Sequence, residues 1–121
     1  MENIILNDGE RLDKVNEQLT IIQKKDGLTF GTDAFMLASF IKSMPKGRAV
    51  ELGAGTGIIS LLLGARERFS SITALEIQND FADLAKRNAK LNGMEEKVKV
   101  LCLDVTKANA SDIGGEADVV F

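Results

Sequence analysis

The stretch Glu51-Leu52-Gly53-Ala54-Gly55-Thr56-Gly57-Ile58 decides how this chain folds, because it joins an apolar run to a helical pattern through a glycine-rich turn. The run 49–52 predicts a β-strand, and the pattern from Gly57 to about Arg66 predicts an α-helix. Glycines at such a turn let the backbone approach a ligand with no Cβ in the way, and the helix N-terminus offers free N–H groups. The turn is therefore a candidate ligand-binding loop or, alternatively, a tight strand-to-helix connection that binds nothing.

The alternation of strand and helix continues to the end of the sequence. Its patterns predict strands at 72–76, 98–103 and 117–121, and a helix at 79–92 that Gly93 closes in a left-handed conformation. Strands and helices at this spacing indicate right-handed crossovers, so residues 48–121 are expected to form a doubly wound α/β core with a mainly parallel sheet. The fourth strand should return beside the first, and we expect its apolar edge to be covered by further chain, a second copy or a partner.

Residues 1–47 are expected to form an arm, a hairpin and a helix that belong to the same structural unit. The segment 1–18 is polar and predicts an arm or a short edge element. The runs 19–23 and 28–30 flank Lys24-Lys25-Asp26-Gly27, and an Asp-Gly pair between two β-prone runs predicts a β-hairpin. Thr32 is predicted to cap a helix that runs through Ser43 and is ended by Pro45 and Gly47.

Composition excludes several kinds of chemistry. The 121 residues include no histidine and one cysteine, Cys102, which excludes a histidine general base, a Cys/His zinc site and a disulfide framework; we assign no metal ligand. No apolar run is long enough to span a membrane and no secretory signal is visible, so the expected location is cytoplasmic and no membrane partner is expected. A formal net charge of -3 provides no overall attraction to nucleic acid.

Acidic residues stand at three successive strand ends around the glycine-rich turn. Glu51 lies two residues before Gly53, a suitable position beside a cation, and Glu76 ends the second strand, where a carboxylate can accept hydrogen bonds from both ribose hydroxyls. Asp104 closes the third strand and either meets the exocyclic amine of an adenine or caps the turn before Thr106. Ile58 stands where a dinucleotide fingerprint has its third glycine, which favours a cationic nucleoside without phosphates; a nicotinamide-dependent oxidoreductase remains the alternative.

The motifs ELGAGTGIISLLL, ALEIQ and CLDV resemble the nucleoside-binding motifs of class I S-adenosylmethionine-dependent methyltransferases, which have a Rossmann-like fold. With the upstream segment IIQKKDGLTFGTDAFMLASFI, residues 10–121 are similar to the bacterial tRNA(Val) adenine-N6-methyltransferase-like family. The resemblance implies that S-adenosylmethionine is the cofactor and assigns it nine residues. They are Gly53, Gly55 and Gly57 beneath the cofactor, Glu51 near its methionine end, Glu76 on the ribose, Asp104 and Ile77 at the adenine, and Thr32 and Asp33 closing the pocket near the methionine. A packing role is the alternative for Ile77.

Members of that family place an Asn-Pro-Pro-Tyr motif directly after the fourth strand, where it binds the amine that is methylated. This sequence ends at Phe121 without the motif, so we assign no catalytic residue and expect the cofactor-binding, N-terminal portion of a methyltransferase. The resemblance implies adenine in tRNA as the acceptor, with protein glutamine or a small molecule as alternatives. Six basic residues are candidates to contact nucleic acid; alternatively, they only form part of the solvated surface. They are Arg11, Lys14, Lys24, Lys25, Lys42 and Lys46. A non-catalytic module that dimerises through the open sheet edge is a further alternative.

Overall fold

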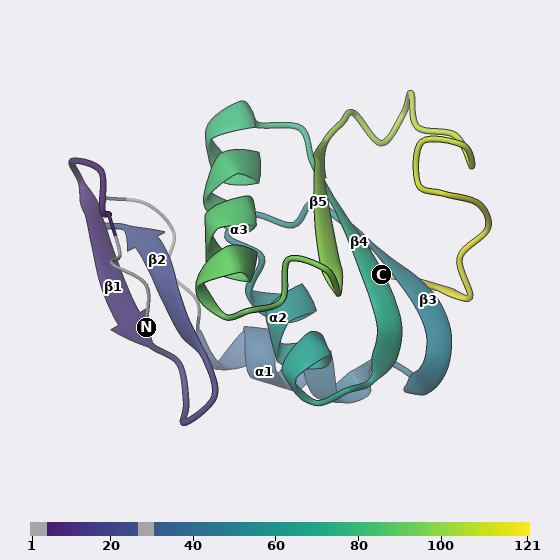
Figure 1. Cartoon of the computed structure of the whole chain (residues 1–121), viewed down its shortest axis with the longest axis horizontal. Coiled ribbons are helices and arrows are strands. Elements are labelled where there is room, and N and C mark those ends of the chain that lie inside the picture. Colours follow the sequence, from purple (N-terminus) through teal and green to yellow (C-terminus); the bar gives the residue numbers. More distant parts are fainter. Residues whose placement is uncertain (1–4, 27–30) are drawn as a thin grey trace.

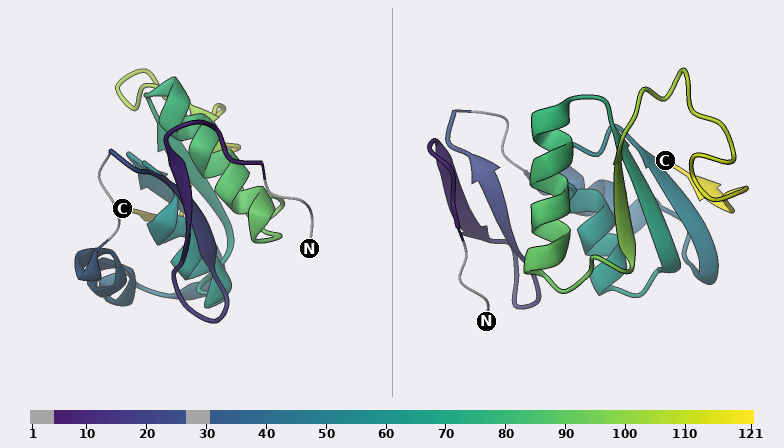
Figure 2. Two further views of the ribbon diagram at one scale, coloured as in Figure 1. Left: turned by 90° about the vertical axis from the view of Figure 1, so that its left-hand side faces the viewer. Right: turned by 45° about the horizontal axis from the view of Figure 1, so that its top comes forward.

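The computed structural model describes residues 5–26 and 31–121 and contains two β-sheets and three helices within those ranges (Figure 1). The three helices lie on one side of the larger sheet, with the smaller sheet beyond them (Figures 1 and 2). In chain order the elements are β1 (Glu10–Lys14), β2 (Thr20–Lys24), α1 (Thr32–Phe40), β3 (Met44–Leu52), α2 (Ile58–Ala65), β4 (Phe69–Glu76), α3 (Asn79–Leu91), β5 (Val98–Cys102) and β6 (Val119–Val120).

The larger sheet is parallel and has the strand order β5-β4-β3-β6. The fourth core strand therefore lies beside the first, as predicted, with Ala49 opposite Val119. The α/β fold with a parallel sheet and an N-terminal hairpin is confirmed. Because parallel strands all end at the same edge of the sheet, the ends of β3, β4 and β5 come together there.

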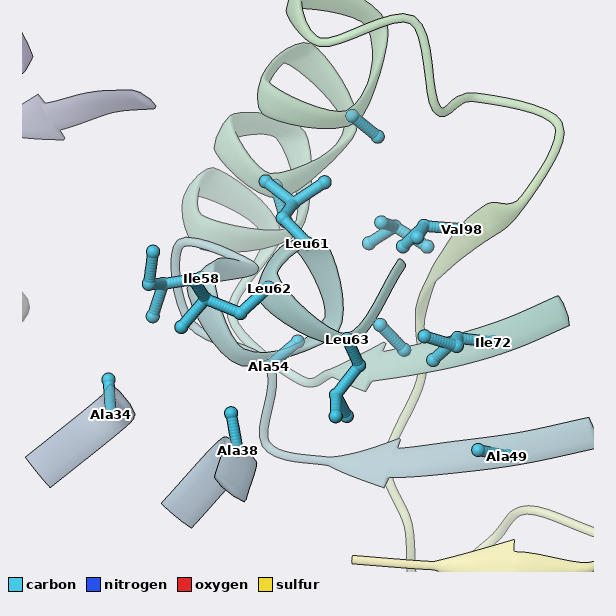
Figure 3. Packing of buried hydrophobic residues seen from close by; sticks show 14 of the residues in the cluster. Ala34, Ala38, Ala49, Ala54, Ile58, Leu61, Leu62, Leu63, Ile72 and Val98 are labelled. Carbon is cyan, nitrogen blue, oxygen red and sulfur yellow. The ribbon is translucent and has the colours of Figure 1, made fainter. Parts of the chain in front are cut away.

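The hydrophobic core lies between this sheet and the helices (Figure 3). The apolar sequence of α2 buries Leu61, Leu62 and Leu63, which are at most 1% exposed. Ala34 and Ala38 of α1 are also buried in this cluster, and their small side chains let α1 approach α2 closely. This packing holds the N-terminus of α2, and with it the glycine-rich turn, against the sheet.

The N-terminal hairpin in the described residues lies upstream of the predicted one and shares one strand with it, the run 19–23, which falls largely in β2. β2 pairs antiparallel with the upstream strand β1, in the segment expected to be an arm or edge element. The side chain of Asn16 accepts hydrogen bonds from the N–H groups of Gln18 and Leu19, at 2.8 and 2.9 Å, and so forms the turn that joins β1 to β2. The strand predicted at 28–30 lies outside the described residues.

Helix α1 corrects two expectations at its ends. The residue before the helix is Gly31, no side chain caps the first turn, and Thr32 is the first helical residue, so the predicted capping role of Thr32 is wrong. The helix ends at Phe40 rather than Ser43. Pro45 and Gly47 lie inside β3, where the pairing with β4 is irregular between Met44 and Arg48. Proline lacks the N–H that a regular ladder needs, so an irregular position of this kind is where a strand tolerates it.

Candidate functional site

The turn between β3 and α2 has three glycines in left-handed conformations. Gly53, Gly55 and Gly57 have φ angles of 74°, 57° and 88°, a region that side-chain-bearing residues adopt at a cost. A Cβ added at Gly53 or Gly55 would meet no atom within 4 Å, so the space beside these two residues is open. The N–H groups of Gly53 and Ala54 both donate to the Leu75 carbonyl at 2.9 Å, which fixes the turn on β4.

Glu76 ends β4 with its carboxylate directed at this turn. The Gly55 N–H donates to Oε1 at 2.8 Å and the Gln78 N–H donates to Oε2 at 2.9 Å, while the residue as a whole is 7% exposed. A carboxylate oxygen has two lone pairs, so each oxygen can accept one further hydrogen bond. The carboxylate can thus accept hydrogen bonds from two further donors beside the open space at Gly55.

Glu51 is buried beneath the turn and is only 3% exposed. The Ser60 hydroxyl of α2 donates to Oε1 of Glu51 at 2.6 Å. Burial raises the pKa of Glu51 to about 7; the Ser60 hydrogen bonds oppose this shift and the negative charge of Glu76 adds to it. Glu51 therefore ionises near neutral pH and faces the helix rather than open solvent.

Ser60 was not identified from the sequence as the hydrogen-bond partner of Glu51. Its signal is a lone hydroxyl within the otherwise apolar run Ile58–Ala65, on the first turn of a helix. A buried hydroxyl needs a partner, and Glu51 at the end of the adjoining strand supplies it.

Asp104 follows β5 at the same edge of the sheet. The Leu103 N–H donates to the Glu76 carbonyl at 3.1 Å, which brings the two strand ends together. Oδ1 of Asp104 accepts hydrogen bonds from the Thr106 N–H at 2.9 Å and the Thr106 hydroxyl at 2.7 Å, and these bonds lower the pKa of Asp104. The turn-capping geometry anticipated for Asp104 is thus present, and it occupies one carboxylate oxygen.

The remaining candidate residues are exposed. Ile77 is 62% exposed beside Glu76, so it contributes an apolar surface at the sheet edge rather than packing in the core. Thr32 and Asp33 are exposed at the start of α1. Within residues 31–121, neither Thr32 nor Asp33 makes a hydrogen bond or an ion pair with the glycine-rich turn.

Residues 5–26 and 31–121 contain no group of three His, Cys, Asp or Glu side chains arranged to hold a metal ion. Within the same ranges, every helix is too short or too polar to cross a bilayer.

The family model described as "Methyltransferase small domain" matches residues 21–119. Among curated proteins, the chain is 27% identical over 89 residues to the tRNA1(Val) (adenine(37)-N6)-methyltransferase of Vibrio campbellii, covering 74% of this chain and 37% of that protein. It is 29% identical over 86 residues to the release factor glutamine methyltransferase of Chlorobaculum tepidum, covering 70% of this chain and 29% of that protein. The chain thus spans about a third of the length of these relatives.

Solved structures show the same fold. TYW2 of M. jannaschii, in complex with AdoMet, superposes with a TM-score of 0.76 at 17% identity over 98% of this chain and 53% of that one. TYW2 of P. horikoshii, in complex with MeSAdo, gives a TM-score of 0.75 at 18% identity over 94% of this chain and 42% of that one. Since the family model covers most of the sequence and these structures share its fold, the chain belongs to the methyltransferase small domain family and forms a class I S-adenosylmethionine-dependent methyltransferase domain.

Proposed function

We propose that this domain binds S-adenosylmethionine across the turn 53–57 and is the cofactor-binding portion of an enzyme that methylates the exocyclic amine of adenine in tRNA. The observation that carries the proposal is the Glu76 carboxylate, buried and bonded to the Gly55 N–H at 2.8 Å beside open space. This arrangement fits a ribose, because the two carboxylate oxygens retain acceptor capacity for two hydroxyls.

The other assigned residues extend the proposed site from the ribose in both directions. Towards the adenine, Ile77 offers an exposed apolar surface and Asp104 a carboxylate with one oxygen turned to its own loop. Towards the methionine, Glu51 provides a group whose negative charge is favoured by a nearby cation. We propose that Thr32 and Asp33 close this end of the pocket.

Gly53, Gly55, Gly57 and Glu76 would hold S-adenosylmethionine, which would supply a methyl group to an acceptor amine; as the amine forms its bond to the methyl carbon, the carbon–sulfur bond would break, the sulfur would leave as a neutral thioether and the amine would lose a proton. The protein's part in such a reaction is positioning and exclusion of water rather than acid–base chemistry. A reaction that needs positioning but no acid–base catalyst suits a chain without histidine, in which the acids at the three strand ends hold a ligand.

The tRNA acceptor is supported by the names of the relatives, and the glutamine enzyme among them supports a protein acceptor as the second candidate. Of the candidate cations, three are already paired with acids: Arg11 with Asp13, Lys14 with Glu17 and Lys24 with Asp80. The other three, Lys25, Lys42 and Lys46, are exposed. We therefore expect these three lysines to make most of the contacts with tRNA phosphates. We place the activity in the cytoplasm, where the exposed thiol of Cys102 would stay reduced.

Calorimetric titration with S-adenosylhomocysteine tests cofactor binding. Glu76→Ala should weaken binding by roughly ten- to a hundredfold, the loss expected when hydrogen bonds to a charged group are removed. Glu96→Ala, an exposed acid on the loop before β5, is the matched control and should bind as the wild type does. Folded wild-type protein that does not bind, or that loses the ligand to NADH in competition, would refute the proposal.

A pair of glycine variants separates backbone strain from obstruction of the ligand. Gly55→Ala and Gly93→Ala both place a Cβ in open space at a positive φ, 57° and 69°, so both should lose similar stability. Only Gly55→Ala should weaken S-adenosylhomocysteine binding. The acceptor is then tested with full-length enzyme and tritiated S-adenosylmethionine: label entering unmodified tRNA supports the adenine assignment, and label entering a release factor instead would replace it.

A further inference from the structure

Two asparagines, Asn88 in helix α3 and Asn92 directly after its end, bond to the outer edge of β2. The Ile22 N–H donates to Oδ1 of Asn88 at 2.6 Å, and Nδ2 of Asn88 donates to the Ile22 carbonyl at 3.1 Å. Asn92 makes the same pair of bonds with Thr20, at 3.0 and 2.8 Å. The two amides thus take the place of a neighbouring strand and satisfy backbone groups that would otherwise lie unpaired at this edge.

The two asparagines differ in their remaining hydrogen bond. Nδ2 of Asn88 also donates to the Thr56 carbonyl, within the glycine turn, at 2.9 Å. Nδ2 of Asn92 instead donates to the Asn88 carbonyl of its own helix at 2.8 Å. Asn88 is fully buried, with 0% exposure, so its amide has no water to replace a lost partner.

The glycine turn is held from two sides. Its first half rests on β4, through the bonds to Leu75 and Glu76. Its second half rests on α3, where a Cβ on Gly57 would come within 3.3 Å of Ala85 and where Asn88, one turn further on, bonds to Thr56. A segment with three left-handed glycines has little conformational preference of its own, so these contacts decide its shape.

We infer that Asn88 is a positioning residue for the cofactor: its amide fixes Thr56, and with it the turn 53–57, and links this turn to the N-terminal hairpin. The inference rests on the proposed function, because it assumes that the ligand lies across this turn. It also implies a reciprocal effect: if the Asn88 bond to Thr56 strengthens ligand binding, the bound ligand stabilises that bond by the same free energy, and so holds the amide against Ile22.

Asn88→Ala and Asn92→Ala form a matched pair for the test. Each removes the bonds to one residue of β2, and only the first removes the bond to the turn. Asn88→Ala should raise the Kd for S-adenosylhomocysteine about tenfold, whereas Asn92→Ala should change it by less than about twofold. The carbonyl carbon shift of Thr56, which reports the hydrogen bond that this carbonyl accepts, should move in Asn88→Ala and stay in place in Asn92→Ala.

Amide exchange in the wild type provides a second test that does not depend on a variant folding. Saturating S-adenosylhomocysteine should slow exchange of the Ile22 N–H, which is bonded to Asn88, more than that of the Thr20 N–H, which is bonded to Asn92. Equal slowing at both sites, or equal affinities in the two variants, would overturn the positioning role alone. Failure of the folded wild type to bind would refute the proposed function and this inference together.

Discussion

Replacing Glu51 by glutamine should raise the stability of the protein above pH 7 and leave it nearly unchanged at pH 4.5. Burial raises the pKa of Glu51 from 4.5 to about 7, so between these values the folded protein holds a proton that the unfolded chain releases. The folded state therefore binds more protons in this window, and stability falls as the pH rises through it. At about 1.4 kcal/mol per pKa unit, the loss is roughly 3 kcal/mol and is complete above pH 7.

Denaturant unfolding of the wild type and Glu51→Gln at several pH values between 4.5 and 8 measures this difference. The chain has neither tryptophan nor tyrosine, so circular dichroism is the appropriate signal, and it has no histidine to titrate in the same window. Glutamine keeps an oxygen that can accept the Ser60 hydroxyl, which confines the change to the charge. The control Glu96→Gln changes an exposed acid and should follow the wild-type profile. Wild-type and Glu51→Gln curves that stay parallel across the range would refute the reasoning.

Three further predictions concern an ion pair, a buried core residue and a hydrogen bond. Arg87 donates to both carboxylate oxygens of Glu10, at 2.7 and 2.9 Å, so a double-mutant cycle with Arg87→Met and Glu10→Gln should show a coupling of about 1–3 kcal/mol; additive losses would contradict it. Leu61→Ala removes a fully buried side chain and should cost roughly 2–5 kcal/mol in denaturant unfolding; a loss below about 1 kcal/mol would contradict the close packing of Leu61 in the core. Thr106→Val removes the hydroxyl that donates to Asp104, so the pKa of Asp104 should rise in an NMR titration of its carboxyl carbon, and an unchanged value would show that the bond is not formed in solution.

The core elements were predictable because their signals are local. The helix predicted at 79–92 is α3 at Asn79–Leu91, and Gly93 has the left-handed φ of 69° expected after its end. The helix predicted from Gly57 to Arg66 is α2, and the strand predicted at 72–76 lies within β4. Periodicity is set by which side of each element is buried, so it is visible in a few consecutive residues.

The N-terminal hairpin shows where local signals compete. The Asp26-Gly27 pair predicts a turn into a strand at 28–30, which lies outside the described residues, and the strand before it also pairs with an upstream strand through the turn that Asn16 closes. The capping prediction for α1 was also wrong. Thr32 has a side chain that suits the N-cap position, but Gly31 occupies that position. In both places a residue that the sequence analysis did not single out forms the local structure: Asn16 forms the turn before β2, and Gly31 is the N-cap of α1.

The sequence by itself determined the alternation of strands and helices, the glycine-rich turn and the acids at the strand ends, because each of these depends on neighbours along the chain. Only the tertiary structure decided which of those acids meets the turn, that Glu51 is buried against Ser60 with its pKa raised to about 7, and that Asn88 joins β2 to Thr56. These properties arise between residues that folding brings together from distant positions, where burial and hydrogen-bond geometry exist only once the whole sheet and its helices have packed.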